Sequence, residues 1–169
     1  VLHYTDIAKK CAEKGIDLIS MDMIPRTTLA QKMDVLSSQA NIAGYKSVIL
    51  AANELGKIFP LMMTAAGTIS PAKVVIMGAG VAGLQALGTA KRLGAVVEVS
   101  DIRTAVKEEV QSLGGRFIEV EGAEDMQDSG GYAKEASPEF LQKQKETIFK
   151  HVTEADIVIT TALVPGRKA

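Results

Sequence analysis

Three glycines, Gly78, Gly80 and Gly83, form a Gly-x-Gly-x-x-Gly pattern directly after the apolar residues 74–77. In such a pattern the first glycine makes a tight turn, the second lets the backbone approach a pyrophosphate, and the third lets a helix pack on a strand. The free N–H groups at the start of that helix suit phosphate oxygens. Asp101 lies 18 residues after Gly83, where a carboxylate can accept the hydroxyl groups of an adenine ribose. We therefore predict a dinucleotide site, the alternative being a glycine-rich turn that only packs.

The acidic residue also predicts which dinucleotide is preferred. A carboxylate at Asp101 hydrogen-bonds the ribose hydroxyls of NAD(H) and repels the 2′-phosphate of NADP(H). Arg103 stands two residues later, and its positive charge attracts phosphate. We expect NAD(H) to be preferred, with Arg103 softening that preference.

A second region with chemical potential is the polar stretch over residues 25–41, which crosses from a loop into a helix. Its arginine, glutamine, aspartate and serine side chains supply hydrogen-bond donors and acceptors that suit a planar amide. The alternative is a helix start headed by aspartate with solvated neighbours, because Asp and Ser are common near helix N-termini.

The residue types of a proton-transfer enzyme are scarce in this sequence. Its two histidines are His3, near the start, and His151, which we expect on the surface near the end of a charged helix. Oxidation of an alcohol or amine by NAD needs a base as well as a hydride acceptor. Hydride transfer between two nicotinamide rings needs only that the rings be positioned. Because no Ser/His/Asp set or metal-ligand spacing is visible either, the sequence favours the second chemistry and predicts no metal site.

A third candidate region is the polar loop over residues 121–136, which contains paired glycines beside Tyr132. Loops of this length within a compact unit are usually functional or disordered. We predict a mobile flap with one anchoring aromatic residue, the alternative being a surface insertion without a role.

Composition excludes several classes of protein. The 169 residues are 47% apolar and 23% charged, with a net charge of −1, which is typical of a globular domain and argues against nucleic acid as the main partner. The sequence lacks the run of about 18 apolar residues that a membrane-spanning helix needs. The lone Cys11 cannot form an internal disulfide and fits a reducing compartment.

Hydrophobic periodicity predicts the elements that position these regions. Before residue 73 we predict a helix over 5–14, a strand over 16–21 and a long helix over 34–59. Helices then alternate with buried strands, which indicates a parallel sheet with right-handed crossovers. A doubly wound domain usually has about six strands, so we expect this chain to be a piece of a longer protein. The predicted strands are residues 73–77, 96–100, 116–120 and 157–160, and the predicted helices are 81–93, 104–113 and one beginning at 137.

Four further motifs carry a resemblance to a known family. Residues 31–41 read QKMDVLSSQAN, and the later segments read TAAGT at 64–68, GGYAK at 130–134 and TTALVPG at 160–166. With the glycine turn, these segments resemble the NAD(H)-binding component of proton-translocating NAD(P) transhydrogenase. The related alanine dehydrogenases share the fold and the glycine turn but differ over the first of these segments.

The resemblance implies an α/β fold with a Rossmann-like doubly wound parallel sheet, truncated at the C-terminus. That sheet is preceded by the end of a first α/β domain and a long connecting helix. The implied boundaries are an incomplete first domain over residues 1–37, an interdomain helix over 38–59 and an incomplete NAD-binding domain over 60–169.

The same resemblance implies a role for each polar region. Arg26, Asp34 and Ser37 hold the nicotinamide carboxamide of NAD(H), and Gln31 lies where that ring meets the nicotinamide of NADP(H) on a partner domain. Tyr132 belongs to a loop that closes over bound nucleotide. The predicted cofactor-binding set is Gly78, Gly80, Val81, Ala82, Gly83, Asp101, Ile102, Arg103, Tyr132, Gln144, Thr161, Ala162 and Leu163.

The implied activity is direct hydride transfer between NADH and NADP+, coupled to proton translocation. The implied partners are an NADP(H)-binding domain, a proton-translocating membrane domain and a second copy of the chain, without direct membrane insertion. The complex would lie on the cytoplasmic side of a bacterial inner membrane or in the mitochondrial matrix, and we expect the fragment to be inactive alone. The alternatives are an alanine-dehydrogenase-like oxidoreductase and a nucleotide-binding module without turnover.

Overall fold

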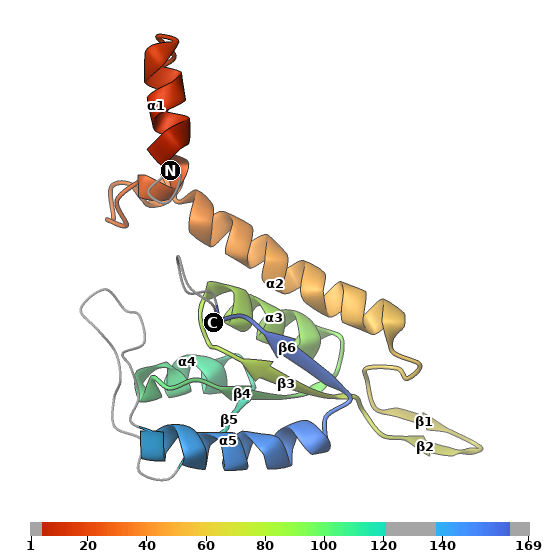
Figure 1. Cartoon of the computed structure of the whole chain (residues 1–169). Helices are drawn as coiled ribbons and strands as arrows, with labels where there is room; N and C mark the ends of the chain where they lie inside the picture. The colour runs from red at the N-terminus through yellow and green to blue at the C-terminus, as the bar shows by residue number, and fades with distance from the viewer. Residues whose placement is uncertain (1–4, 121–137, 163–169) are drawn as a thin grey trace. The chain divides into compact units, whose positions relative to one another are not determined.

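The computed structural model describes residues 5–120 and 138–162 (Figure 1). These residues form two compact units, one reaching to Ala40 and the other spanning Asn41–Ala162. The long helix α2, Val35–Glu54, begins in the first unit and continues into the second.

The first unit is built from short helical elements. These are α1, Thr5–Glu13, followed by two 3-10 turns, η1 at Met21–Met23 and η2 at Gln31–Met33. The predicted strand over residues 16–21 is wrong, because most of this segment has no regular structure. A strand needs a neighbour to accept its backbone hydrogen bonds, and none of the described residues pairs with this segment.

The second unit is organised by a four-stranded parallel sheet. Its strand order is β5-β4-β3-β6, so the first strand of the α/β unit, β3, lies between the second and the fourth. This is the order of a doubly wound dinucleotide-binding domain, and it places the topological switch point between β3 and β6. The strands are β3 at Lys73–Met77, β4 at Val96–Ser100, β5 at Arg116–Phe117 and β6 at Ile157–Thr160.

Helices cover both faces of this sheet. Figure 1 shows α3, Val81–Arg92, and α5, Pro138–Thr153, on opposite sides of the strands. Between β4 and β5 the chain forms η3, Thr104–Val106, and α4, Lys107–Ser112. An antiparallel hairpin of β1, Met62–Thr64, and β2, Gly67–Ile69, precedes the sheet. The predicted helix over 104–113 is therefore split into a 3-10 turn and a short α-helix.

The core lies where α2 and α3 pack against the sheet. Val48 from α2, Leu87 from α3 and Ile76 from β3 are each fully buried and belong to one apolar cluster. Phe59 joins this cluster, and its carbonyl accepts a hydrogen bond from the amide of Ala72. α2 ends at Glu54 rather than at residue 59, and Phe59 enters the core from a bent segment that follows it.

The close packing of α3 on β3 gives a prediction about stability. A Cβ at Gly83 would overlap the carbonyl oxygen of Gly78, whereas a Cβ at Gly88 in the same helix would meet nothing within 4 Å. Gly83→Ala should therefore lower the free energy of unfolding by about 1–3 kcal/mol. Gly88→Ala should raise it by up to about 1 kcal/mol, because alanine favours helix. Urea denaturation followed by circular dichroism measures both, and equal effects at the two sites would contradict the packing described here.

Candidate functional site

The glycine turn lies at the carboxyl edge of the sheet, between β3 and α3. Gly78 has φ +105°, a conformation that side chains rarely adopt, and its amide donates to the carbonyl of Ser100 at 2.7 Å. A Cβ at Gly78 would lie 2.5 Å from the hydroxyl of Thr161. Gly78 and Gly83 are thus required by the packing of the turn itself.

Gly80 is different from its two neighbours in the motif. It caps the N-terminus of α3 in an extended conformation that any residue can adopt, with φ −81° and ψ −170°. A Cβ at Gly80 would meet no protein atom within 4 Å. The first-turn N–H groups of a helix have no partner within the helix. The absence of a side chain at Gly80 therefore leaves open space beside donors that suit a phosphate.

Thr161 supports the turn from its position directly after β6. Its amide donates to the carbonyl of Met77 at 2.9 Å, and its hydroxyl lies 3.1 Å from the carbonyl oxygens of both Met77 and Gly78. In this structure the hydroxyl therefore binds the turn.

Asp101 joins the end of β4 to the same turn. Its Oδ2 accepts a hydrogen bond from the amide of Ala79 at 2.7 Å, and its side chain is buried. Arg103 forms an ion pair with the carboxylate, with Nη2 3.0 Å from Oδ2. Burial alone would raise the pKa of Asp101, but the hydrogen bonds from Arg103 and Ala79 outweigh it and hold the pKa below its usual value. The group is therefore anionic at neutral pH.

A second polar cluster lies at the start of α2. The two oxygens of Asp34 accept hydrogen bonds from the amide of Ser37 at 2.9 Å and from its hydroxyl at 2.7 Å. The guanidinium of Arg26 lies 3.7 Å from Asp34 and 3.4 Å from the Ser37 hydroxyl. The bonds from Ser37, with the charge of Arg26, lower the pKa of Asp34. The structure thus brings three of the four predicted nicotinamide-site residues together.

The remaining predicted residues have the following positions. Gln31 begins η2 and is exposed, Ile102 follows Asp101 and is half-buried, and Gln144 is half-buried on α5. Val81 and Ala82 form the first turn of α3, and Ala162 is exposed just after Thr161. Tyr132 and Leu163, with the loop over residues 121–136, lie outside the described residues.

An ionic network that residue spacing did not predict lies at the opposite, amino edge of the sheet. Glu98 of β4 is buried, and its Oε2 lies 2.8 Å from Nδ1 of His151 and 3.4 Å from Nζ of Lys73. His151 is thus paired on a half-buried face rather than placed on the surface alone. The available signal was Glu98 itself, because an acid inside an apolar strand needs a buried partner.

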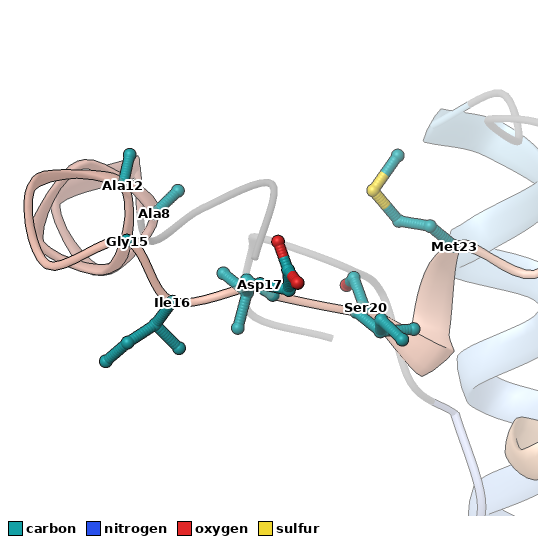
Figure 2. A pocket seen from close by; sticks show the side chains of 9 residues that line it. Ala8, Ala12, Gly15, Ile16, Asp17, Ser20 and Met23 are labelled. Carbon is teal, nitrogen blue, oxygen red and sulfur yellow. The ribbon is translucent and has the colours of Figure 1, made fainter.

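A hollow of about 760 Å³ lies elsewhere among the described residues. Figure 2 shows its lining around α1 and the segment that follows, including Ala8, Ile16 and Met23. Its lining is mainly apolar, with Asp17 and Ser20 as polar members, and it contains none of the predicted site residues. The polar donors that suit a nucleotide instead converge at the carboxyl edge.

Across residues 5–120 and 138–162, no helix is both long and apolar enough to cross a membrane. Within these same ranges, no three His, Cys, Asp or Glu side chains gather in a way that could hold a metal ion.

The Asp34 cluster gives a prediction that separates capping from charge. Asp34→Ala removes the acceptor for the Ser37 amide and should lower the thermal midpoint of unfolding. Asp34→Asn keeps an acceptor oxygen and should retain most of the wild-type stability, because Asn caps helices about as well as Asp. Circular dichroism at 222 nm follows the unfolding. If both variants lost the same stability, the capping role of Asp34 would be excluded.

Comparisons with known proteins agree with this architecture. A family model described as alanine dehydrogenase/PNT, C-terminal domain, matches residues 47–169. The NAD(P) transhydrogenase subunit alpha of Cereibacter sphaeroides is 51% identical over 166 residues, which cover 97% of this chain and 32% of that protein. The chain therefore spans about a third of the length of this relative.

Two solved structures are also similar to the chain. The transhydrogenase of Sinorhizobium meliloti superposes with a TM-score of 0.84 at 50% identity, covering 98% of this chain and 43% of that one. An L-alanine dehydrogenase superposes with a TM-score of 0.63 at 25% identity, covering 97% of this chain and 40% of that one. The doubly wound sheet with its glycine turn and the match over residues 47–169 lead to one conclusion: the chain belongs to the alanine dehydrogenase/PNT C-terminal domain family.

Proposed function

We propose that the carboxyl edge of the sheet binds NAD(H). The observation that carries the proposal is the open space at Gly80, beside the N-terminus of α3 and next to the switch point between β3 and β6. A pyrophosphate placed there accepts hydrogen bonds from the N–H groups of the helix start. Asp101, fixed at the neighbouring strand end by the amide of Ala79, accepts the ribose hydroxyls.

The nicotinamide end of the cofactor, which supplies or accepts the hydride, is assigned to the cluster at the start of α2. Asp34, held by Ser37, offers an acceptor to the amide nitrogen of the carboxamide, and Arg26 offers a donor to its oxygen. Gln31 is exposed in η2, three residues before Asp34, where a second nucleotide on a partner domain can reach it.

The activity we propose is hydride transfer between NADH and NADP+, as a component of an NAD(P) transhydrogenase. The support is the 50–51% identity to proteins that carry this name and the amide-binding character of the Arg26, Asp34 and Ser37 cluster. His151 contacts Glu98 at the amino edge of the sheet, so it does not serve the glycine turn as a base. Direct transfer between two rings needs no such base.

The proposed partners follow from the same activity. An NADP(H)-binding domain supplies the second nicotinamide, and a membrane domain couples the transfer to proton translocation on the cytoplasmic or matrix side of its membrane. A second copy of the chain completes a homodimer. The second candidate function is an alanine-dehydrogenase-like oxidoreductase, which the similarity to L-alanine dehydrogenase favours.

Gly80→Val tests the nucleotide site. The new side chain would fill the space that the pyrophosphate needs, so the affinity for NADH should fall by roughly a hundredfold or more. The fold should survive, because the backbone angles at Gly80 suit any residue. Gly88→Val is the matched control, since its side chain also enters open space, but within α3. Calorimetric titration measures both, and native affinity in a folded Gly80→Val protein would place the phosphates elsewhere.

Gln31→Ala tests the transhydrogenase assignment. If Gln31 bridges the two nicotinamide rings, its loss should slow hydride transfer by roughly a hundredfold and leave the dissociation constant of NADH nearly unchanged. Stopped-flow transfer to an NADP+-loaded partner domain, with the chain in its native protein context, gives the rate. Gln111→Ala, an exposed position on α4, is the control.

Two outcomes would contradict this assignment. Weaker NADH binding with an unchanged rate of hydride transfer at saturation would show that Gln31 contributes to binding NADH and not to the transfer itself. NAD-dependent oxidation of alanine in the absence of NADP(H) would favour the alanine-dehydrogenase-like function instead.

A further inference from the structure

The carboxylate of Asp101 is fully occupied in this structure. Its Oδ1 accepts hydrogen bonds from the amide of Arg103 at 2.9 Å and from Nε of Arg103 at 3.0 Å. Its Oδ2 accepts from the amide of Ala79 at 2.7 Å and from Nη2 of Arg103 at 3.0 Å. A carboxylate offers about four acceptor positions, so none is left for a ribose hydroxyl.

The four hydrogen bonds divide into two kinds. The two from backbone amides fix the carboxylate at the end of β4 and are compatible with a bound ribose. The two from the guanidinium come side by side from one planar group, as the two hydroxyls of a ribose diol would. The Arg103 side chain therefore fills the positions that the diol needs, and it must leave before the adenosine end of a nucleotide can bind.

The Asp101–Arg103 ion pair is shielded from water, which strengthens the attraction between the two charges. The side chain of Arg103 is 16% exposed and that of Asp101 is 7% exposed. Charges separated by about 3 Å in such surroundings interact far more strongly than on an open surface. A guanidinium displaced from Asp101 stays tethered two residues away, next to the ribose position, and it is well suited to bind a phosphate bidentately.

We propose that Arg103 is a specificity-determining residue that fills the ribose subsite until a nucleotide displaces it and then pairs with a 2′-phosphate when one is present. The inference rests on the proposed nucleotide site. Asp101 alone would reject NADP(H) through repulsion between its carboxylate and the 2′-phosphate. Arg103 offsets this repulsion, so the preference of the chain for NADH over NADPH is smaller than Asp101 alone would produce.

The test is the ratio of the dissociation constants of NADPH and NADH. Both nucleotides must displace the guanidinium, so this cost cancels in the ratio and the effect of the 2′-phosphate remains. Arg103→Met keeps the length of the side chain and removes its charge and donors. With the chain in its native protein context, the ratio should rise at least roughly tenfold in this variant, while the affinity for NADH should be equal or tighter.

Two further variants make the experiment specific. Arg92→Met removes the same charge from the exposed last turn of α3 and should leave the ratio unchanged. Arg103→Lys keeps the charge without the planar fork, so the ratio should stay near the wild-type value while NADH binds more tightly. This variant also tests the proposal if Arg103→Met does not fold.

Three outcomes overturn the proposal. They are an unchanged or lower ratio in folded Arg103→Met, an equal change in Arg92→Met, and NADH binding weakened more than tenfold by loss of Arg103. The first two leave NADH binding by the unsubstituted chain, and with it the proposed function, intact. If the wild-type chain bound neither nucleotide, both the proposed function and the ribose subsite at Asp101 would be contradicted.

Discussion

The close approach of α3 to β3 is the constraint on which the rest of the second unit depends. A side chain at Gly83 would overlap the backbone carbonyl of residue 78, so the helix start can lie against the end of the strand only if position 83 is glycine. This contact fixes the N-terminus of α3 beside the open space at Gly80. It also sets the amide of Ala79 within hydrogen-bond reach of Asp101. The packing of α3, the open space at Gly80 and the contact of Ala79 with Asp101 therefore all lie at one turn.

The two edges of the sheet carry different polar groups. At the carboxyl edge, backbone groups of the turn and the side chains of Asp101 and Thr161 converge, as parallel sheets generally arrange their ligand sites. At the amino edge, Glu98 contacts Lys73 and His151, and Lys73 also pairs with Glu154. The buried acid in β4 is therefore balanced without a residue from the proposed site.

The sequence predicted the regular parts of the fold well, because they depend on local patterns. The bounds of β3, β4 and β6 agree with the predicted strands, since each is a short, largely apolar run, and β3 and β4 are buried over most of their length. The segment over residues 16–21 has the same appearance, yet it forms no strand, because strand formation depends on a partner that periodicity does not reveal. The ionic network and the occupied carboxylate of Asp101 depend on side-chain directions, which residue spacing leaves open. The roles assigned to Gln31, Asp34 and the glycine turn remain predictions.

The hydroxyl of Thr161 has a consequence for the order of events during synthesis. It binds the carbonyls of Met77 and Gly78, more than 80 residues earlier in the chain. A nascent chain on the ribosome therefore holds the complete glycine motif long before the strand that braces it has emerged. These contacts to the turn form only when β6 docks on β3, so the proposed nucleotide site would be completed late in folding. If the turn binds a dinucleotide as proposed, incomplete chains that lack β6 would bind it poorly.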